Sequence, residues 1–313
     1  MKSYPKISFI IPAKDEEKNV RILYDKITQA CKPLTNDYEI LFIDDGSKDQ
    51  TFEELKKIKQ ADPKIKVIRL RGWFGKSIAL QTGFENTSGE IIITMDADLQ
   101  DDPKEIPNFL KKLDEGYDLV SGWKKIRHDP LSKTFPSKIG NIAAKFLTGV
   151  KIHDLNCGFK AYRKEVTNSL HLYGELYKYI PILAAKQNFK VGEIVVSHRP
   201  RKFGKSKFGW ERNIKGFLDL LTVVFLTGYL NRPGHFFGTT GFISFFFGFI
   251  IGLYIAFLRI TTGSIQNRHP LLYLGMLLMI IGIQLVTTGL LAEMFVSFNQ
   301  RKSNSQKYIK EIL

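Results

Sequence analysis

Short apolar runs alternate with amphipathic segments over the first two-thirds of the chain. Four of the runs are rich in β-branched residues and bounded by turn residues, as buried parallel strands are; they cover residues 6–13, 38–47, 66–71 and 90–98. Apolar residues between the runs recur at helical spacing, and they indicate helices within residues 20–30, 52–58 and 103–116. This alternation predicts an α/β fold with a doubly wound, mostly parallel sheet, whose ligands bind at the carboxyl ends of the strands.

Two long runs in the last third carry no charge and have no polar face; they cover residues 236–258 and 271–292. Each exceeds the roughly 20 residues that an α-helix needs to cross a bilayer, which favours membrane spans over buried core helices. Basic residues are abundant before the first run and in the tail, whereas the short connection holds only Arg259, Arg268 and His269. The positive-inside rule therefore predicts a multi-pass protein of the cell inner (plasma) membrane, with both ends cytoplasmic.

These patterns divide the chain into four parts. Residues 1–209 form a cytoplasmic α/β domain, residues 235–298 form two transmembrane helices, and residues 299–313 form a basic cytoplasmic tail. Residues 210–234 combine Arg212 and Lys215 with an apolar stretch too short and too interrupted to span. We expect them to form an interfacial amphipathic region that meets anionic headgroups.

Carboxylates follow three of the four predicted strands, and they include Asp15, Glu16, Asp44, Asp45, Asp96 and Asp98. In an extended strand, residues two apart share a face, so Asp96 and Asp98 are expected to point the same way. Two carboxylates so close repel each other unless a cation lies between them, and hard oxygen ligands favour Mg²⁺ or Mn²⁺. The sequence therefore predicts a metal site whose further ligand is a diphosphate, whereas Asp101 and Asp102 are expected to cap the helix that begins near Pro103.

Five motifs, taken together and in order, resemble those of glycosyltransferase family 2, which has the GT-A fold. They are IIPAKDEEKN, FIDDGSKDQT, MDADLQDDP, DLNCGFKAYRKEV and RPRKFGKSKFG, and they extend over much of residues 7–209. Within the family, the chain is most similar to the polyprenyl-phosphate glycosyltransferases, the relatives of dolichol-phosphate mannose synthase. The two apolar runs match the bacterial type of that group, which has two C-terminal transmembrane helices.

The resemblance implies a GT-A catalytic domain at residues 1–209 and a role for each matching position. Pro12, Ala13, Asp15 and Glu16 would line the nucleoside pocket, and Asp44 would contact the base. Asp96 would contact the ribose or the metal, Asp98 would ligate the metal, and Gln100 would lie beside the metal and the sugar phosphates. Arg201, Ser206 and Lys207 would belong to a loop that closes over the diphosphate, where a guanidinium can neutralise phosphate charge.

The implied reaction is an inverting transfer of a sugar from a UDP- or GDP-linked donor to a polyprenyl (undecaprenyl) phosphate, which makes a polyprenyl-phosphate-sugar. The acceptor phosphate is mostly ionised at neutral pH, so it needs cations to guide it more than it needs a base. Candidates for these cations are Lys124, Lys125, Arg127 and Lys138. Asp154 is expected to position a cation or the sugar, with a structural turn as the alternative.

Three residues depart from the family pattern. The segment after the third strand reads RGWFGKS, with Gly72 and Trp73 where the family often has Arg-Asn. Lys160 replaces a common Arg, a change that keeps the charge but loses bidentate geometry.

Other functions fit the sequence less well. The net charge of +15 suggests nucleic-acid binding, but the basic residues cluster beside the predicted spans and no such motif is present, so we expect no nucleic-acid partner. A nucleotide-sugar pyrophosphorylase would have a Gly-rich loop near the start, whereas this chain has the acidic PAKDEEKN there. A processive polysaccharide synthase would have a Gln-x-x-Arg-Trp motif, which this sequence does not contain. A transferase of the same fold with another lipid or glycan acceptor and, more distantly, a non-catalytic basic membrane scaffold remain alternatives. The donor sugar and homo-oligomerisation stay open.

Overall fold

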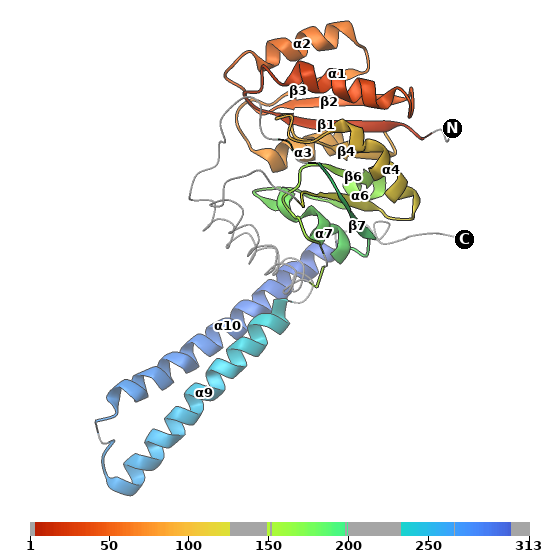
Figure 1. Ribbon diagram of the computed structural model, residues 1–313. Helices are drawn as coiled ribbons and strands as arrows, with labels where there is room; N and C mark the ends of the chain where they lie inside the picture. Colours follow the sequence, from red (N-terminus) through yellow and green to blue (C-terminus); the bar gives the residue numbers. More distant parts are fainter. Residues whose placement is uncertain are drawn as a thin grey trace. The chain divides into compact units, whose positions relative to one another are not determined.

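The computed structural model describes residues 4–125, 149–150, 152–197, 199, 233–265 and 267–301 (Figure 1). The chain divides into two compact units, residues 1–224 and 225–313. The predicted interfacial region lies outside the described residues up to residue 232, and so does the tail from residue 302.

A seven-stranded sheet forms the framework of the first unit, with the strand order β3-β2-β1-β4-β6-β5-β7. The four predicted strands are present as β1 (Ile7–Ala13), β2 (Tyr38–Asp44), β3 (Ile65–Arg69) and β4 (Ile91–Thr94). The other three are β5 (Leu119–Trp123), β6 (Lys160–Arg163) and β7 (Val191–Val195). Only β6 runs antiparallel to its neighbours among the described strands, so the prediction of a mostly parallel sheet is confirmed.

Helices cover both faces of this sheet. On one face, α1 (Val20–Cys31), α2 (Thr51–Ala61) and α4 (Ile106–Asp114) share an apolar core with Ile7, Phe9 and Ile11 of β1. On the other face lies α3 (Lys76–Glu85), where a Cβ at Gly83 would touch the side chain of Ile10. The remaining short helices are η1 (Pro103–Glu105), α6 (Lys164–Ser169), η2 (Leu176–Tyr179) and α7 (Ile180–Lys186). Alternate residues of a buried strand therefore face two different helical layers.

The second unit contains α9 (Pro233–Thr262) and α10 (His269–Arg301), which pack against each other. Both helices are long and apolar enough to cross a membrane, and they include the two predicted spans. Each extends beyond the charge-free run, because a helix continues for as long as its backbone hydrogen bonds do, whatever the polarity of its side chains.

Glycines at seven-residue spacing bring α9 and α10 close together. A Cβ at Gly241 would lie 2.7 Å from the carbonyl oxygen of Gly282, and one at Gly248 would lie 2.5 Å from that of Gly275. Within the same helix pair, Ser244 Oγ donates to the Leu278 carbonyl at 2.9 Å. Small residues at such crossings let two backbones approach closely, and the van der Waals contacts that result help to drive helix association in lipid.

Candidate active site

The loops after β1 and β2 are joined by hydrogen bonds at the carboxyl end of the sheet. The Asp15 amide donates to Ser47 Oγ at 2.9 Å, and the Lys48 amide donates to Asp15 Oδ1 at 2.7 Å. The Glu16 amide donates to Thr51 Oγ1 at 2.7 Å. Asp15 adopts a φ of 50°, a conformation that Asp tolerates better than most residues. Hydrogen bonds therefore hold the β1 loop against the β2 loop at one edge of the sheet. The residues expected to line the nucleoside pocket lie at this edge; they are Pro12, Ala13, Asp15 and Glu16.

Two adjacent aspartates at the end of β2 have different partners. Asp44 is fully buried; its Oδ1 accepts from the Ser47 amide at 3.1 Å and its Oδ2 lies 3.3 Å from Arg69 Nε. Asp45 accepts hydrogen bonds from the amides of Phe74 and Gly75 at 2.8 and 2.9 Å. The β2 loop therefore fixes the start of α3 as well as its own turn.

Gly46 allows the segment after β3 to lie directly on the β2 loop. A Cβ at Gly46 would lie 2.6 Å from the carbonyl carbon of Gly72, and its φ of 67° also favours glycine. Trp73 projects from this contact with 73% of its surface exposed, and Lys14 Nζ lies 5.7 Å from its ring centroid. Trp73, which departs from the family pattern, is therefore an exposed side chain beside the site and does not pack in the core.

The predicted shared strand face of Asp96 and Asp98 is wrong. Strand β4 ends at Thr94, and residues 97–98 form a turn, with Leu99 at a φ of 62°. Asp98 is buried, and its Oδ1 accepts from the Gln100 amide at 3.1 Å. Because the side chain of Asp98 bonds to the backbone two residues on, the chain turns there and the alternation of a strand does not apply.

Asp96 lies in a cluster of cations brought together from distant parts of the chain. Its carboxylate forms an ion pair with Lys76 Nζ, at the first residue of α3. Burial raises the pKa of the Asp96 carboxyl, but the ammonium groups of Lys76 and Lys124 outweigh it and hold the pKa below its ordinary value. Asp96 is therefore ionised at neutral pH.

The segment that contains Gly158 gives Asp96 its space. A Cβ at Gly158 would lie 2.6 Å from Asp96 Cγ and 2.7 Å from its Oδ1. Two residues further on, Lys160 is buried and donates to the Cys157 carbonyl, and burial lowers the pKa of its ammonium. The DLNCGFK motif thus places the backbone of Gly158 against the Asp96 carboxylate, and it also contributes the buried Lys160.

Lys124 and Asp101 form a buried ion pair, with 2.8 Å between Nζ and Oδ1. Burial lowers the pKa of Lys124, but the charges of Asp101 and Asp96 outweigh it and the net shift is upward. Asp101 therefore does not cap the helix after Pro103, which corrects that expectation. Asp102 does: its side chain accepts from the Lys104 amide at 3.3 Å.

Asp154 is almost fully buried and holds two turns together. Its Oδ1 accepts from the Asn156 amide at 3.1 Å, and its Oδ2 accepts from the Lys124 amide at 3.3 Å. Its own amide donates to Glu193 at 3.1 Å. These contacts are of the kind that a structural turn residue makes, and they connect Asp154 to the Lys124 backbone.

Gln100 contacts the chain that leaves β7. Its Nε2 donates to the Arg199 carbonyl at 3.4 Å, and its own carbonyl accepts from the Arg199 amide at 3.0 Å. The Arg199 guanidinium pairs with Asp102. The start of the RPRKFGKSKFG motif therefore lies against the aspartate-rich turn.

The remaining acceptor candidates differ in what the structure describes. Lys125 is exposed, and its Nζ lies 5.8 Å from the centroid of Trp123, which is stacked on His153. Arg127 and Lys138 lie outside the described residues, as do Arg201, Ser206 and Lys207.

The sequence analysis did not identify two cations of the site, Lys76 and Arg69. For Lys76 one signal was available, because it is a cation at the start of a helix whose first turn has no acidic residue.

The donor atoms at this edge fit a hard divalent ion. Asp96 and Asp98 offer carboxylate oxygens, which are the ligands that such an ion prefers. Gly158 leaves room for the Asp96 carboxylate, because a Cβ at position 158 would clash with it. Within the described residues, no three side chains of His, Cys, Asp or Glu gather as a metal cluster. The two carboxylates would thus leave most coordination positions to substrate oxygens and water.

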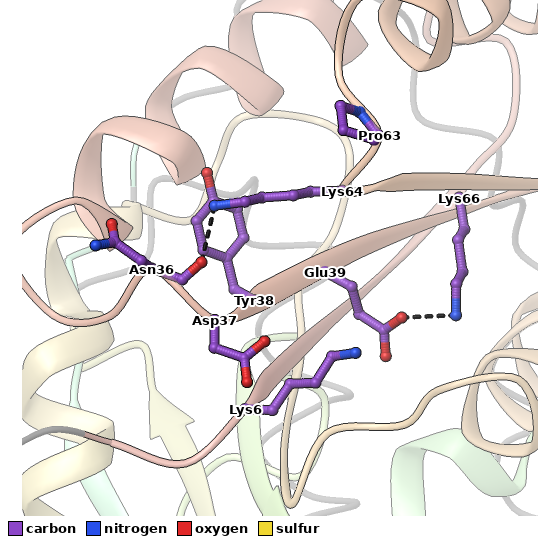
Figure 2. Close-up of a pocket in the computed structure, with 8 residues that line it drawn as sticks. All are labelled: Lys6, Asn36, Asp37, Tyr38, Glu39, Pro63, Lys64 and Lys66. Carbon is purple, nitrogen blue, oxygen red and sulfur yellow. Dashed lines mark hydrogen bonds and ion pairs between the residues drawn. The ribbon is translucent and has the colours of Figure 1, made fainter.

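A separate hollow of about 300 Å³ lies at the opposite, amino end of β2 and β3 (Figure 2). Three of its polar side chains already have partners within the hollow: Lys66 Nζ lies 2.7 Å from Glu39 Oε2, and Lys64 Nζ donates to the Asn36 carbonyl at 2.8 Å. The carboxyl end of the sheet is the better candidate for chemistry, because the acidic turns that follow β1, β2 and β4 are there.

Known proteins are similar to this chain in sequence or in fold. The family model described as "Glycosyl transferase family 2" matches residues 8–170. The dodecaprenyl-phosphate galacturonate synthase of Rhizobium johnstonii is 35% identical over 97% of this chain and 91% of its own length. The undecaprenyl-phosphate 4-deoxy-4-formamido-L-arabinose transferase of Photorhabdus laumondii is 33% identical over 98% of this chain and 94% of its own length.

Among solved structures, the first unit has a similar fold to glucosyl-3-phosphoglycerate synthase from Mycobacterium tuberculosis, crystallised with Mn²⁺, UDP and phosphoglyceric acid. The TM-score is 0.55 at 20% identity, covering 71% of this chain and 78% of that one. At this identity the likeness concerns the fold alone. Sequence and fold together place the protein: it is a member of glycosyl transferase family 2.

Proposed function

We propose that this glycosyltransferase transfers a sugar from a nucleotide diphosphate sugar to a polyprenyl phosphate, with inversion at the anomeric carbon. The similarity to two prenyl-phosphate sugar transferases carries the proposal, because it covers 97–98% of the chain and so includes both apolar helices as well as the acidic edge. A lipid acceptor needs an enzyme held at the membrane, and α9 and α10 can hold it there.

The acidic edge would bind the donor. Asp96 and Asp98 would hold Mg²⁺ or Mn²⁺, an ion that neutralises the diphosphate as it leaves. Pro12, Ala13, Asp15, Glu16 and Asp44 would bind the nucleoside, and the bonds between the β1 and β2 loops support this because they fix the pocket before the donor arrives. Arg201, Ser206 and Lys207 would close over the diphosphate with Gln100 beside it.

Of the two acceptor candidates that the structure describes, Lys125 is the better suited to the phosphate. It is exposed, whereas Lys124 is engaged with Asp101 in a buried pair. Lys125, with Arg127 and Lys138, would guide the anionic phosphate towards the sugar, and Lys124 would act through Asp101 by fixing the turn that carries Asp98 and Gln100. Asp154 would keep the Lys124–Lys125 segment in place and would not take a proton.

A donor screen tests the function. The full chain in detergent is incubated with undecaprenyl phosphate, Mg²⁺ or Mn²⁺, and one radiolabelled donor at a time: UDP-glucose, UDP-N-acetylhexosamine, GDP-mannose, and nucleotide-linked galacturonate and 4-formamido-arabinose. We expect solvent-extractable label that requires both the lipid and the metal. Label that reaches a water-soluble acceptor, or none with any donor, would contradict the proposed function.

The proposed membrane topology places the first unit in the cytoplasm and residues 259–270 outside. Cysteines are introduced one at a time at Ser264, between α9 and α10, and at Ser303, which lies in the tail outside the described residues. The native Cys31 and Cys157 are buried and serve as an internal blank. A membrane-impermeant maleimide should label only the Ser264→Cys variant in intact cells; labelling of Ser303→Cys alone would reverse the topology.

A further inference from the structure

Lys76 is a cation in contact with a candidate metal ligand, and none of the roles proposed above uses it. Its ammonium pairs with the Asp96 carboxylate, and the two side chains are 22% and 29% exposed. Lys76 Nζ also lies 5.2 Å from the ring centroid of Tyr177, which contributes cation–π attraction. The pair is thus partly shielded from water yet open enough for exchange with solutes.

The position of Lys76 is fixed by its backbone. Asp45 accepts hydrogen bonds from the amides of Phe74 and Gly75, the two residues immediately before it. At the other end of the segment, Gly72 lies against Gly46 at a distance that leaves no room for a side chain on Gly46. The β2 loop therefore sets where the Lys76 side chain starts, and only its flexible stem can move the ammonium.

Lys76 is electrostatically unfavourable for its own helix. It is the first residue of α3, whose first turn has no acidic residue, and the amino end of a helix already carries a partial positive charge. A cation at that position therefore needs an anion outside the helix. In the structure that anion is Asp96, and a diphosphate would serve the same purpose.

We propose that Lys76 is a switching counterion: it holds Asp96 in the donor-free enzyme, releases it to the divalent ion, and turns its ammonium to the diphosphate of the donor. The inference rests on the proposed function for the identity of the donor. Lys76 and a divalent ion compete for the same carboxylate, so Lys76 weakens binding of the metal alone and favours its binding together with nucleotide diphosphate. The lysine thereby couples metal binding to donor binding, and such coupling is reciprocal.

Metal affinity without nucleotide separates this role from a structural one. We would titrate Mn²⁺ into the detergent-solubilised full chain and follow the free ion by electron paramagnetic resonance, for wild type, Lys76→Met and Lys76→Arg. The apparent dissociation constant scales inversely with the fraction of Asp96 that is available. We expect Lys76→Met to bind Mn²⁺ alone about tenfold more tightly than wild type. Lys76→Arg keeps the charge and should stay within about threefold of wild type.

The affinity for nucleotide should change in the opposite direction to the affinity for Mn²⁺. With saturating Mn²⁺, we expect Lys76→Met to bind UDP, or GDP if the screen selects it, about tenfold more weakly than wild type. A residue with only a structural role would weaken both or neither. Equal or weaker binding of Mn²⁺ by Lys76→Met, or no measurable binding by either protein, would overturn the proposal.

Two controls make the result specific. Lys56→Met removes one exposed charge from α2, where Lys56 pairs with Glu53, and should leave Mn²⁺ affinity unchanged. Adding Asp98→Ala to Lys76→Met should abolish the gained affinity; a gain that persists would mean that the ion binds elsewhere, and the proposal fails. A wild type that binds Mn²⁺ and nucleotide but transfers sugar to another acceptor would sink the proposed function and leave the role of Lys76 standing.

Discussion

The carboxylate of Asp96 occupies the space in which a side chain at position 158 would stand, since a Cβ on Gly158 would lie 2.6 Å from Asp96 Cγ. The two residues are far apart in sequence and belong to different motifs. Their contact arises because Thr94 of β4 pairs with Lys160 of β6, which places the ends of the two strands side by side. The absence of a side chain at position 158 is therefore a requirement of the site.

Replacing Gly158 by Ala should lower the rate of transfer about 100-fold, because a displacement of about 1 Å at a catalytic group has that effect. Gly192→Ala is the matched control, since its Cβ would lie 2.7 Å from the Tyr117 ring, away from the carboxylates. Turnover per folded molecule should fall only in Gly158→Ala. Equal turnover in the two variants would mean that the position of Asp96 does not matter.

Asp98→Asn should abolish detectable transfer while the protein stays folded, because an amide keeps the turn but is a poor ligand for a hard cation. Its control is Asp102→Asn, which removes charge from the same segment at a residue that caps η1 and pairs with Arg199. That variant should retain at least about a tenth of the wild-type rate. Transfer by wild type that continues unchanged in EDTA would argue against a metal at this site.

Gly241→Ala and Gly282→Ala should each destabilise the α9–α10 pair by about 1–3 kcal/mol, because the new methyl group forces two backbones apart. Gly238→Ala and Gly252→Ala add a methyl group where nothing lies within 4 Å. They should be neutral or slightly stabilising, since alanine favours helix. Heating in detergent followed by size-exclusion chromatography would rank the four variants, and a common midpoint would contradict the close glycine packing.

Glu39 should give the first unit a pH-dependent part of its stability. Burial raises its pKa, but the ion pair with Lys66 and hydrogen bonds from Ser8 and Ser88 outweigh this and lower it from 4.5 to about 2. The shift corresponds to at most about 3 kcal/mol, and solvent reduces it because Lys66 is half-exposed. Because the folded-state pKa is the lower one, the contribution is complete above about pH 4.5 and disappears as pH falls towards 2.

Glu39→Gln should therefore lower the thermal midpoint by several degrees at pH 7 and by progressively less between pH 4.5 and pH 2.5. Glu53→Gln, which breaks an exposed pair with Lys56, should have little effect at any pH. Fluorescence-monitored melting of the full chain across this range makes the comparison. A gap between wild type and Glu39→Gln that widens on acidification would show that the sign is wrong.

The sequence by itself determined the family and part of the elements, but not α3 or strands β5 to β7. Strands β1 to β4, helices α1, α2 and α4 and both apolar helices were predictable, because apolar periodicity and turn residues are local properties of the chain. The five motifs identified the acidic edge for the same reason. The second, third and fourth strands end earlier than predicted, at Asp44, Arg69 and Thr94. After the fourth strand, the Asp98 side chain accepts a hydrogen bond from the Gln100 amide and the chain turns.

The tertiary structure decided the partners of the charged side chains. Asp96 with Lys76 and Asp101 with Lys124 are pairs that no local pattern indicates. They depend on which strands are neighbours and in what register, and the free energy of burying a charge then selects the partner. The same holds for Gly241 and Gly282, whose meeting depends on how two helices pack. The periodicity of apolar residues in the sequence indicates which side chains share one face of a helix or strand. Only the tertiary structure determines which residues that face contacts.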